Sequence, residues 1–185
     1  MRLVPGQNLK KQFSFYVLLF LFICVIGWIY EVALAFLYGF GFVNRGFLFG
    51  PYLPVYGFGG LILFVSLGGV MEKRRYIKKI PVTPLIVFLL IVLITTVIEY
   101  LTGYVLELLF ARRWWDYSHY SFNLNGRVCL NTSVRFGIGG MVVLYLLVPL
   151  FTRLVQKVPR KGRTVAAFLV AGVLLADFIL TLTRL

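Results

Sequence analysis

Acidic side chains inside long apolar stretches are the residues of this sequence with the clearest capacity for chemistry. Glu31, Glu99, Glu107 and Asp177 all fall within or near such stretches. An unpaired charge at the centre of a bilayer costs about 2.5–3.5 kcal/mol, so an acid in this setting usually faces a partner or a wet cavity. These four residues therefore predict polar interactions inside a membrane-embedded protein.

Three arginines are candidate partners for two of these acids. Arg45 and Arg127 lie in the loops that follow Glu31 and Glu99, and Arg135 lies near the start of the next apolar stretch. A guanidinium group binds a carboxylate or a phosphate with two parallel hydrogen bonds. We expect ion pairs or hydrogen-bond networks that either lock helices together or bind a ligand. The predicted site, in which no residue is assigned a catalytic role, comprises Glu31, Asn44, Arg45, Glu99, Asn125, Arg127 and Arg135.

Motifs for catalysis or metal binding are weak. Asp116 and Ser118 lie too close in sequence to His119 for a diagnostic catalytic triad. His119 is the single histidine, and neither Cys24 nor Cys129 has a partner at metal-ligand spacing. The sequence has no G-x-x-x-x-G-K-[ST] motif for P-loop ATP hydrolysis. We expect no metal site and no cofactor, and the sequence favours a non-enzymatic protein without deciding the question.

The elements that must position these residues are transmembrane helices. The chain has 185 residues, of which 61% are hydrophobic and 14% charged, whereas a soluble domain is about 45–50% apolar and about 25% charged. About 20 apolar residues span a bilayer. We predict an all-α, polytopic bundle that forms a single integral membrane domain over 1–185. Its five spans are expected at about 13–38, 55–71, 84–110, 134–152 and 164–182.

The distribution of basic residues predicts the orientation of these spans. Thirteen of the nineteen Lys and Arg residues fall in the N-terminal tail, 72–80 and 153–163, which a cytoplasmic N-terminus would place inside. The C-terminus would then be extracytoplasmic. A formal net charge of +13 therefore indicates loops that face anionic lipid, not nucleic-acid binding.

Two parts of the sequence resemble each other. Glu31 is followed by Asn44-Arg45-Gly46 and by Tyr56-Gly57-Phe58-Gly59-Gly60; Glu99 is followed by Asn125-Gly126-Arg127 and by Phe136-Gly137-Ile138-Gly139-Gly140. Each copy contains two spans, so both copies would have the same orientation in the membrane. This pattern favours a parallel two-helix repeat, although chance similarity in an apolar sequence is the alternative.

The loop from Val43 to Pro54 is more apolar than an ordinary solvated loop. It contains one charge, and Gly50-Pro51 and Pro54 impose turns. We expect it to fold back as a re-entrant outer segment that lines a cavity. The alternative is an aromatic belt at the outer membrane interface.

Three parts of the sequence indicate a known family. They are Gly27-Trp28-Ile29-Tyr30-Glu31, the 44–60 stretch and Asn123-Leu124-Asn125-Gly126-Arg127-Val128-Cys129. These parts resemble a bacterial membrane family described as putative ABC-transporter type IV permeases. The resemblance implies a multi-pass permease subunit of the bacterial plasma membrane that works with a separate ATPase. Such a small subunit would need a homo-oligomer or a partner to enclose a path, and its outer arginines would suit an anionic substrate. Two alternatives stay open: a membrane enzyme acting on a lipid or lipid phosphate, and a non-catalytic assembly or regulatory protein.

Overall fold

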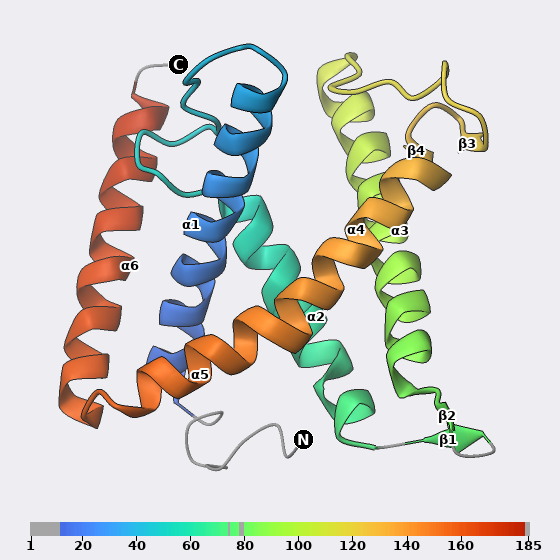
Figure 1. Ribbon diagram of the computed structural model, residues 1–185. Coiled ribbons are helices and arrows are strands. Elements are labelled where there is room, and N and C mark those ends of the chain that lie inside the picture. Colours follow the sequence, from blue (N-terminus) through green and yellow to red (C-terminus); the bar gives the residue numbers. More distant parts are fainter. Residues whose placement is uncertain (1–11, 74, 78–79, 184–185) are drawn as a thin grey trace. The chain divides into compact units, whose positions relative to one another are not determined.

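Within the residues that the structure describes, five helices are long and apolar enough to cross a membrane, as predicted. The computed structural model describes residues 12–73, 75–77 and 80–183 (Figure 1). Every predicted span has its helix, with ends within four residues of the prediction. The helical elements are α1 (Phe13–Leu37), α2 (Pro54–Glu72), α3 (Thr83–Phe110), α4 (Leu130–Val142), η1 (Val143–Leu147), α5 (Val148–Gln156) and α6 (Arg160–Leu182).

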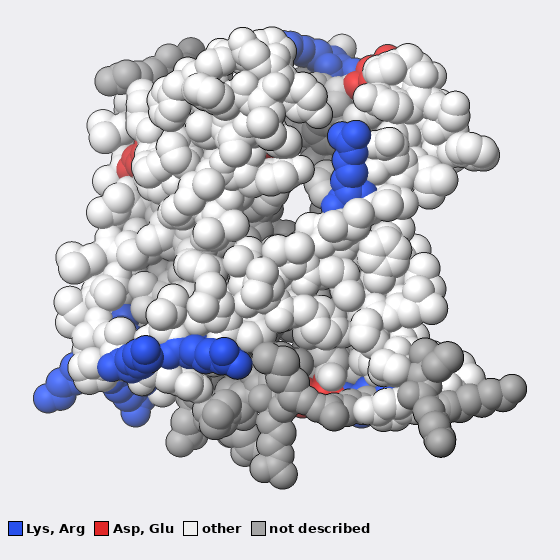
Figure 2. Space-filling view, viewed as in Figure 1, with Lys and Arg blue, Asp and Glu red and all other residues white. Residues whose placement is uncertain are grey.

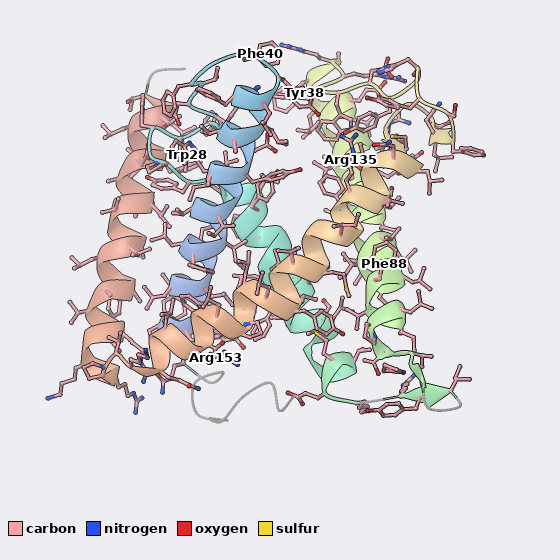
Figure 3. All side chains as sticks on the ribbon, viewed as in Figure 1. Trp28, Tyr38, Phe40, Phe88, Arg135 and Arg153 are labelled. Carbon is pink, nitrogen blue, oxygen red and sulfur yellow. The ribbon has the colours of Figure 1, made fainter. Side chains whose placement is uncertain are left out.

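Several basic residues that contribute to the predicted orientation lie outside the described residues. They are Arg2, Lys10, Lys11, Arg74, Lys78, Lys79 and Arg184. The described members of the predicted inner loops include Arg153, Lys157, Arg160 and Lys161, which are all exposed around the turn between α5 and α6. Figure 3 labels Arg153 on α5 near this turn.

The chain divides into two compact units. Unit 1 contains the chain up to Ile62 and from Tyr145 onward. Within it, α1 packs along α6 and contacts α5, and α1 and α6 begin at the same end (Figure 1). The core of this unit includes Phe15, Leu19 and Ile23, which are at most 2% exposed.

Unit 2 extends from Leu63 to Leu144. It pairs α3 with α4, and these two helices run in opposite directions (Figure 1). Two short antiparallel hairpins accompany the helices: β1 (Tyr76–Ile77) with β2 (Ile80–Pro81), and β3 (Asn123–Leu124) with β4 (Val128–Cys129). The all-α prediction holds for every long element, and these two-residue strands only shape the connections.

The fourth span is interrupted by a wider helical turn. Its five-residue π-helical segment η1 ends at Leu147, two residues before Pro149. Proline has no N–H to donate to the carbonyl four residues earlier, so the regular helical pattern cannot continue unchanged. The span also begins four residues before the predicted start, because Asn131, Thr132 and Ser133 are helical although they are polar.

The outer faces of the helices are apolar, which fits immersion in lipid. On α3, a stripe of side chains at four-residue spacing is at least 47% exposed: Leu85, Leu89, Leu93, Val97 and Leu101. Figure 2 shows that most of the visible surface carries neither basic nor acidic residues. A contiguous apolar face of this length is unusual on a soluble monomer and is what a bilayer requires of a spanning helix.

Candidate functional site

The first membrane acid, Glu31, is bound by a tyrosine. Tyr56, in the first turn of α2, donates a hydrogen bond from its hydroxyl to the Glu31 carboxylate. The two helices can approach here because Gly27, one turn before Glu31, faces the Tyr56 ring, and a Cβ at that glycine would collide with it. Gly27 therefore makes room for the hydrogen-bond donor of the acid.

The loop between α1 and α2, residues 38–53, is fixed to α6 by Asp177. The backbone N–H groups of Phe49 and Gly50 donate to the two carboxylate oxygens at 3.1 and 2.9 Å, and the Tyr52 hydroxyl donates to the same group. Thr181, one turn later on α6, adds a further hydrogen bond at 3.3 Å. Asp177 therefore meets four donors that would otherwise be poorly hydrated.

Burial keeps the Tyr52 hydroxyl, one of these donors, protonated. Tyr52 is 7% exposed, and burial raises the pKa of its phenol, with a further increase from the hydrogen bond to Asp177. The Leu53 N–H also donates to the Cys24 carbonyl of α1 at 3.0 Å. The loop thus packs on both α1 and α6, with Leu48 and Tyr52 in the same apolar cluster as Cys24.

Asn44 is held by hydrogen bonds, whereas its neighbour Arg45 is exposed. The Trp28 indole N–H donates to the Asn44 side-chain oxygen at 2.7 Å, and the Asn44 amide donates to the Phe49 carbonyl at 3.2 Å. Trp28 is labelled on α1 in Figure 3. Arg45 is exposed and forms no hydrogen bond or ion pair within the described residues.

The second membrane acid, Glu99, is also bound by a tyrosine. The Tyr117 hydroxyl, from the segment between α3 and α4, donates to Glu99 Oε1 at 3.1 Å. Burial and the nearby Glu99 charge raise the pKa of Tyr117, so its phenol remains a donor. The other carboxylate oxygen, Oε2, is buried and has no hydrogen-bond partner in the described part of the chain.

Arg127 binds a different acid, Glu107. Its Nη2 and Nε lie 2.8 and 3.1 Å from Glu107 Oε2, while Arg113 Nε reaches the other oxygen at 3.2 Å. The Arg127 guanidinium also lies 5.6 and 5.2 Å from the ring centroids of Tyr100 and Tyr104, within the range of cation–π attraction. Arg127 is therefore neutralised at the end of α3 and not beside Glu99.

The backbone around Asn125 is a tight turn. Asn125 and Gly126 have φ angles of 54° and 68°, and the Arg127 N–H donates to the Leu124 carbonyl at 3.1 Å. Two positive φ values are typical of the Asn-Gly turns that join short antiparallel strands. The Asn125 amide then donates to the Tyr100 hydroxyl at 2.9 Å, so this residue ties the turn to α3.

Asp116 organises the first part of the same segment between α3 and α4. Its Oδ1 accepts hydrogen bonds from the Ser118 backbone and hydroxyl at 2.9 and 2.6 Å. These two bonds are the main reason that the pKa of Asp116 is lowered. The His119 ring packs against Tyr120 and not against this pair, so no Ser-His-Asp relay is assembled.

The predicted acid–arginine pairs are not formed among the described residues. Glu31 and Glu99 are bound by Tyr56 and Tyr117, respectively. Arg45 and Arg135 are exposed and have no ion pair within that part of the chain. The structure thus divides the seven predicted residues between the two units, and their role in ligand binding stays a prediction.

Sequence reasoning missed the tyrosines that serve the acids. Tyrosine near a membrane surface is so often an interfacial anchor that Tyr56, Tyr100, Tyr104 and Tyr117 gave no specific signal. One usable signal was the position of Tyr56, directly before the glycine motif that opens the second span. The role of Asp177 as acceptor for a distant loop had no local signal.

These features define a polytopic helical membrane protein whose spans carry acids bound by phenols and backbone N–H groups. Residues 18–182 match the family described as "Putative ABC-transporter type IV", and the chain belongs to that family. No curated protein and no solved structure matches the chain.

Proposed function

We propose that this chain is the membrane-spanning component of a transporter and that it works with a separate ATPase. The observation that carries the proposal is the family match over residues 18–182, which includes all five membrane-length helices almost completely. An ATPase partner accounts for the lack of a P-loop motif in this sequence.

Equivalent helix contacts support the proposed parallel repeat. In unit 1, Gly57 of α2 faces Cys24 and Phe20 of α1. In unit 2, Gly137 of α4 faces Val92 and Phe88 of α3. The two contacted pairs occupy the same positions relative to Glu31 and Glu99, seven and eleven residues before each acid. The matching positions of the two contacts favour a duplication over chance similarity of apolar sequences.

The two copies differ at their arginines. Position 39, which corresponds to Glu107 in the second copy, is a glycine, so the first copy has no matching acid for Arg45. Arg45 is exposed and has no ion pair in the described part of the chain. Its guanidinium group and the partly polar outer loops support an anionic substrate. In the proposed transporter these loops lie on the extracytoplasmic side, and the segment from Val43 to Pro54 is re-entrant and lines the transport path.

The basic turn between α5 and α6 supports a cytoplasmic position for that end. Arg153, Lys157, Arg160 and Lys161 are exposed there, and cytoplasmic loops are enriched in such residues. In the proposed transporter this turn, with the β1–β2 hairpin, is the part available to an ATPase. Both connections are short, so a second copy or another membrane subunit would complete the docking surface.

Co-purification tests the proposal directly. The chain would be expressed in its own host with an affinity tag, extracted in mild detergent, and its partners identified and quantified. The expected result is that a P-loop ATPase co-purifies with the chain at a fixed molar ratio. Its rate of ATP hydrolysis should change when both proteins are reconstituted in the same liposomes. If the chain purifies without an ATPase in several detergents, the result would support the alternative of a non-catalytic assembly protein.

A further inference from the structure

A widely open cavity of about 500 Å³ lies on the surface beside the first turns of α4. All its lining residues belong to unit 2. This volume is within the range of about 300–1,000 Å³ that is usual for small-molecule sites. The residues that line it are Tyr120, Ser121, Phe122, Leu130, Asn131, Val134 and Arg135.

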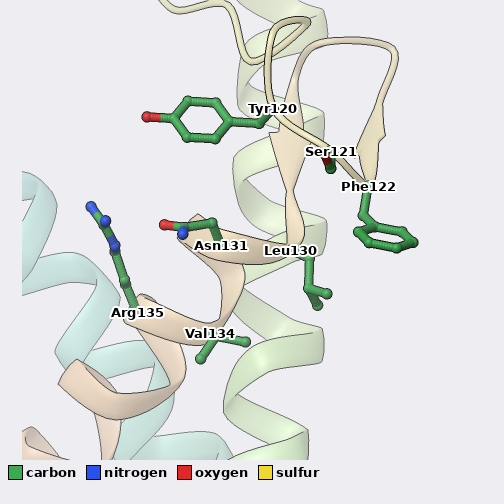
Figure 4. Close-up of a pocket in the computed structure, with 7 residues that line it drawn as sticks. All are labelled: Tyr120, Ser121, Phe122, Leu130, Asn131, Val134 and Arg135. Carbon is green, nitrogen blue, oxygen red and sulfur yellow. The ribbon is translucent and has the colours of Figure 1, made fainter.

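The two sides of this cavity differ in chemistry. Asn131 and Arg135 lie four residues apart on α4 and therefore share one face of the helix, while Leu130 and Val134 share another. Figure 4 shows Tyr120 pointing to the same side as Asn131 and Arg135, whereas Phe122 and Leu130 point to the opposite side. Because the two sets of side chains diverge, a ligand that contacts both must be extended, with a polar end and an apolar end.

Charge favours an anion on the polar side. Arg135 forms no ion pair or hydrogen bond within the described residues, and no acidic residue lines the cavity. The site also lies at the N-terminal end of α4, where the helix dipole attracts negative charge. Arg127, in contrast, is already bound to Glu107, so Arg135 is the guanidinium of this unit that remains available at the cavity.

The apolar side selects among anions. Phe122 is 82% exposed and Leu130 54% exposed, at the end of a helix that is built to cross a membrane. A free phosphate would use only the polar side and leave this apolar surface unmatched. A phospholipid presents a phosphate and hydrocarbon together, in the region where a spanning helix leaves the bilayer core.

We propose that this cavity binds an anionic phospholipid. Arg135 and Asn131 hold its phosphate, and Phe122, Leu130 and Val134 contact the beginning of its acyl chains. The binding needs no bond making or breaking, and it does not depend on the proposed transport function. The lipid would hold the outer segment against α4 as a fixed part of the folded protein.

Lipid titration of the purified full-length chain tests this site. Delipidated protein in detergent is titrated with fluorescent phosphatidylglycerol, phosphatidylcholine and, as a soluble competitor, glycerol 3-phosphate. Both lipids carry a phosphate, but the choline ammonium of phosphatidylcholine cancels its charge and is repelled by Arg135. We therefore expect phosphatidylglycerol to bind about tenfold more tightly, which corresponds to about 1.4 kcal/mol. We expect glycerol 3-phosphate to compete only at far higher concentration.

Variants locate the binding within the protein. Arg135→Gln is expected to weaken phosphatidylglycerol binding about tenfold, and Asn131→Asp to weaken it by placing a carboxylate beside the phosphate. Arg112→Gln is the matched control, because Arg112 belongs to the same outer segment but lies over Trp114 and not at the cavity. Thermal unfolding establishes that each variant is folded.

The outcomes separate the alternatives. Equal affinity for the two lipids, or unchanged binding in both folded cavity variants, would overturn the proposal. Competition by glycerol 3-phosphate at the same concentration as lipid would also overturn it, in favour of a soluble anion. If Arg135→Gln does not fold, Asn131→Asp and Arg135→Lys decide: the first must lose binding and the second must retain most of it.

Discussion

At the residue scale, the main finding is how this protein accommodates carboxylates in apolar helices. Glu31, Glu99 and Asp177 are each bound by a tyrosine hydroxyl, and Asp177 also by backbone N–H groups. A phenol donates a strong hydrogen bond without bringing a second charge into the bilayer. This arrangement avoids the desolvation of a guanidinium group, which reduces the gain from a buried ion pair.

Asp177 provides the first prediction. Asp177→Asn replaces one acceptor oxygen by an amide NH2 group, which cannot accept a hydrogen bond, so at least one of the donors from Phe49, Gly50 and Tyr52 loses its partner. A buried donor without a partner costs about 1–3 kcal/mol, and we expect stability to fall by about 2 kcal/mol. Unfolding in detergent measures this change. The control is Thr181→Ala, which removes only the 3.3 Å bond; if both variants have equal effects, the central role assigned to Asp177 is wrong.

Asp116 provides a pH prediction. Its pKa is lowered in the folded protein by the Ser118 hydrogen bonds, so its stabilising effect is present above the ordinary Asp pKa of about 3.9. That effect is lost as the pH falls through the lowered folded value. Ser118→Ala should raise the pKa of Asp116, and the outer segment should then loosen at a higher pH than in the wild type.

The fluorescence of Trp115 measures this loosening, because its indole N–H donates to the Arg127 carbonyl in the same segment. The Asp116→Asn variant gives the baseline, since its side chain does not titrate. An acid transition at the same pH in the Ser118→Ala and wild-type proteins would show that these hydrogen bonds do not control it.

At the element scale, helix pairing depends on which glycine of each motif faces the neighbouring helix. Gly57 and Gly137 leave no room for a Cβ, whereas Gly59 and Gly139 have open space around the position of a Cβ. The first glycine of each motif is therefore required for packing, and the second is not required by any contact among the described residues.

Paired substitutions test this difference. Gly57→Ala and Gly137→Ala should each destabilise the protein by about 1–3 kcal/mol, because extra volume in a packed contact displaces its neighbours. Gly59→Ala and Gly139→Ala should leave stability unchanged or raise it slightly, since alanine favours helix. Unfolding in detergent compares the four variants. If alanine at the first and at the second glycine of a motif destabilises the protein equally, both the assigned packing role of the first glycine and the repeat would be contradicted.

The number and approximate bounds of the helices could be predicted from the sequence. Hydropathy located five helices because a bilayer requires about 20 apolar residues in succession. It missed the start of α4 because Asn131 and Thr132 are polar, although Ser133 is buried and accepts a hydrogen bond from Thr96 at 2.7 Å. The acids were also found in advance, since charge is conspicuous in apolar sequence. Their donors were not, because pairing over long separations depends on tertiary packing that no local pattern specifies.

At the scale of the whole molecule, orientation is the property that the sequence predicts and that labelling can measure. Cys24 and Cys129 are 0% and 2% exposed, so the natural chain should react little with thiol reagents. Leu124→Cys and Val158→Cys each place a thiol at an exposed position, in the predicted outer and inner connections, respectively. Neither substitution alters the charge distribution that sets the topology.

In intact cells, an impermeant maleimide should label the Leu124→Cys variant and leave the Val158→Cys variant unlabelled. Val158→Cys should react only after the membrane is permeabilised. The wild-type chain gives the background of the two buried cysteines. The reverse pattern would place the N-terminus outside, and with it the proposed ATPase-facing turn on the wrong side of the membrane.

The hydrogen bonds between the 38–53 loop and Asp177 also set an order for biosynthesis. The loop donors precede their acceptor by 125–128 positions. At about 5–20 residues per second, translation needs about 6–25 seconds to cover that distance. During this interval the nascent loop lacks its acceptor, and a chain that stops before the last helix never acquires one. Membrane quality-control proteases should therefore recognise C-terminally truncated chains by this unfinished N-terminal loop.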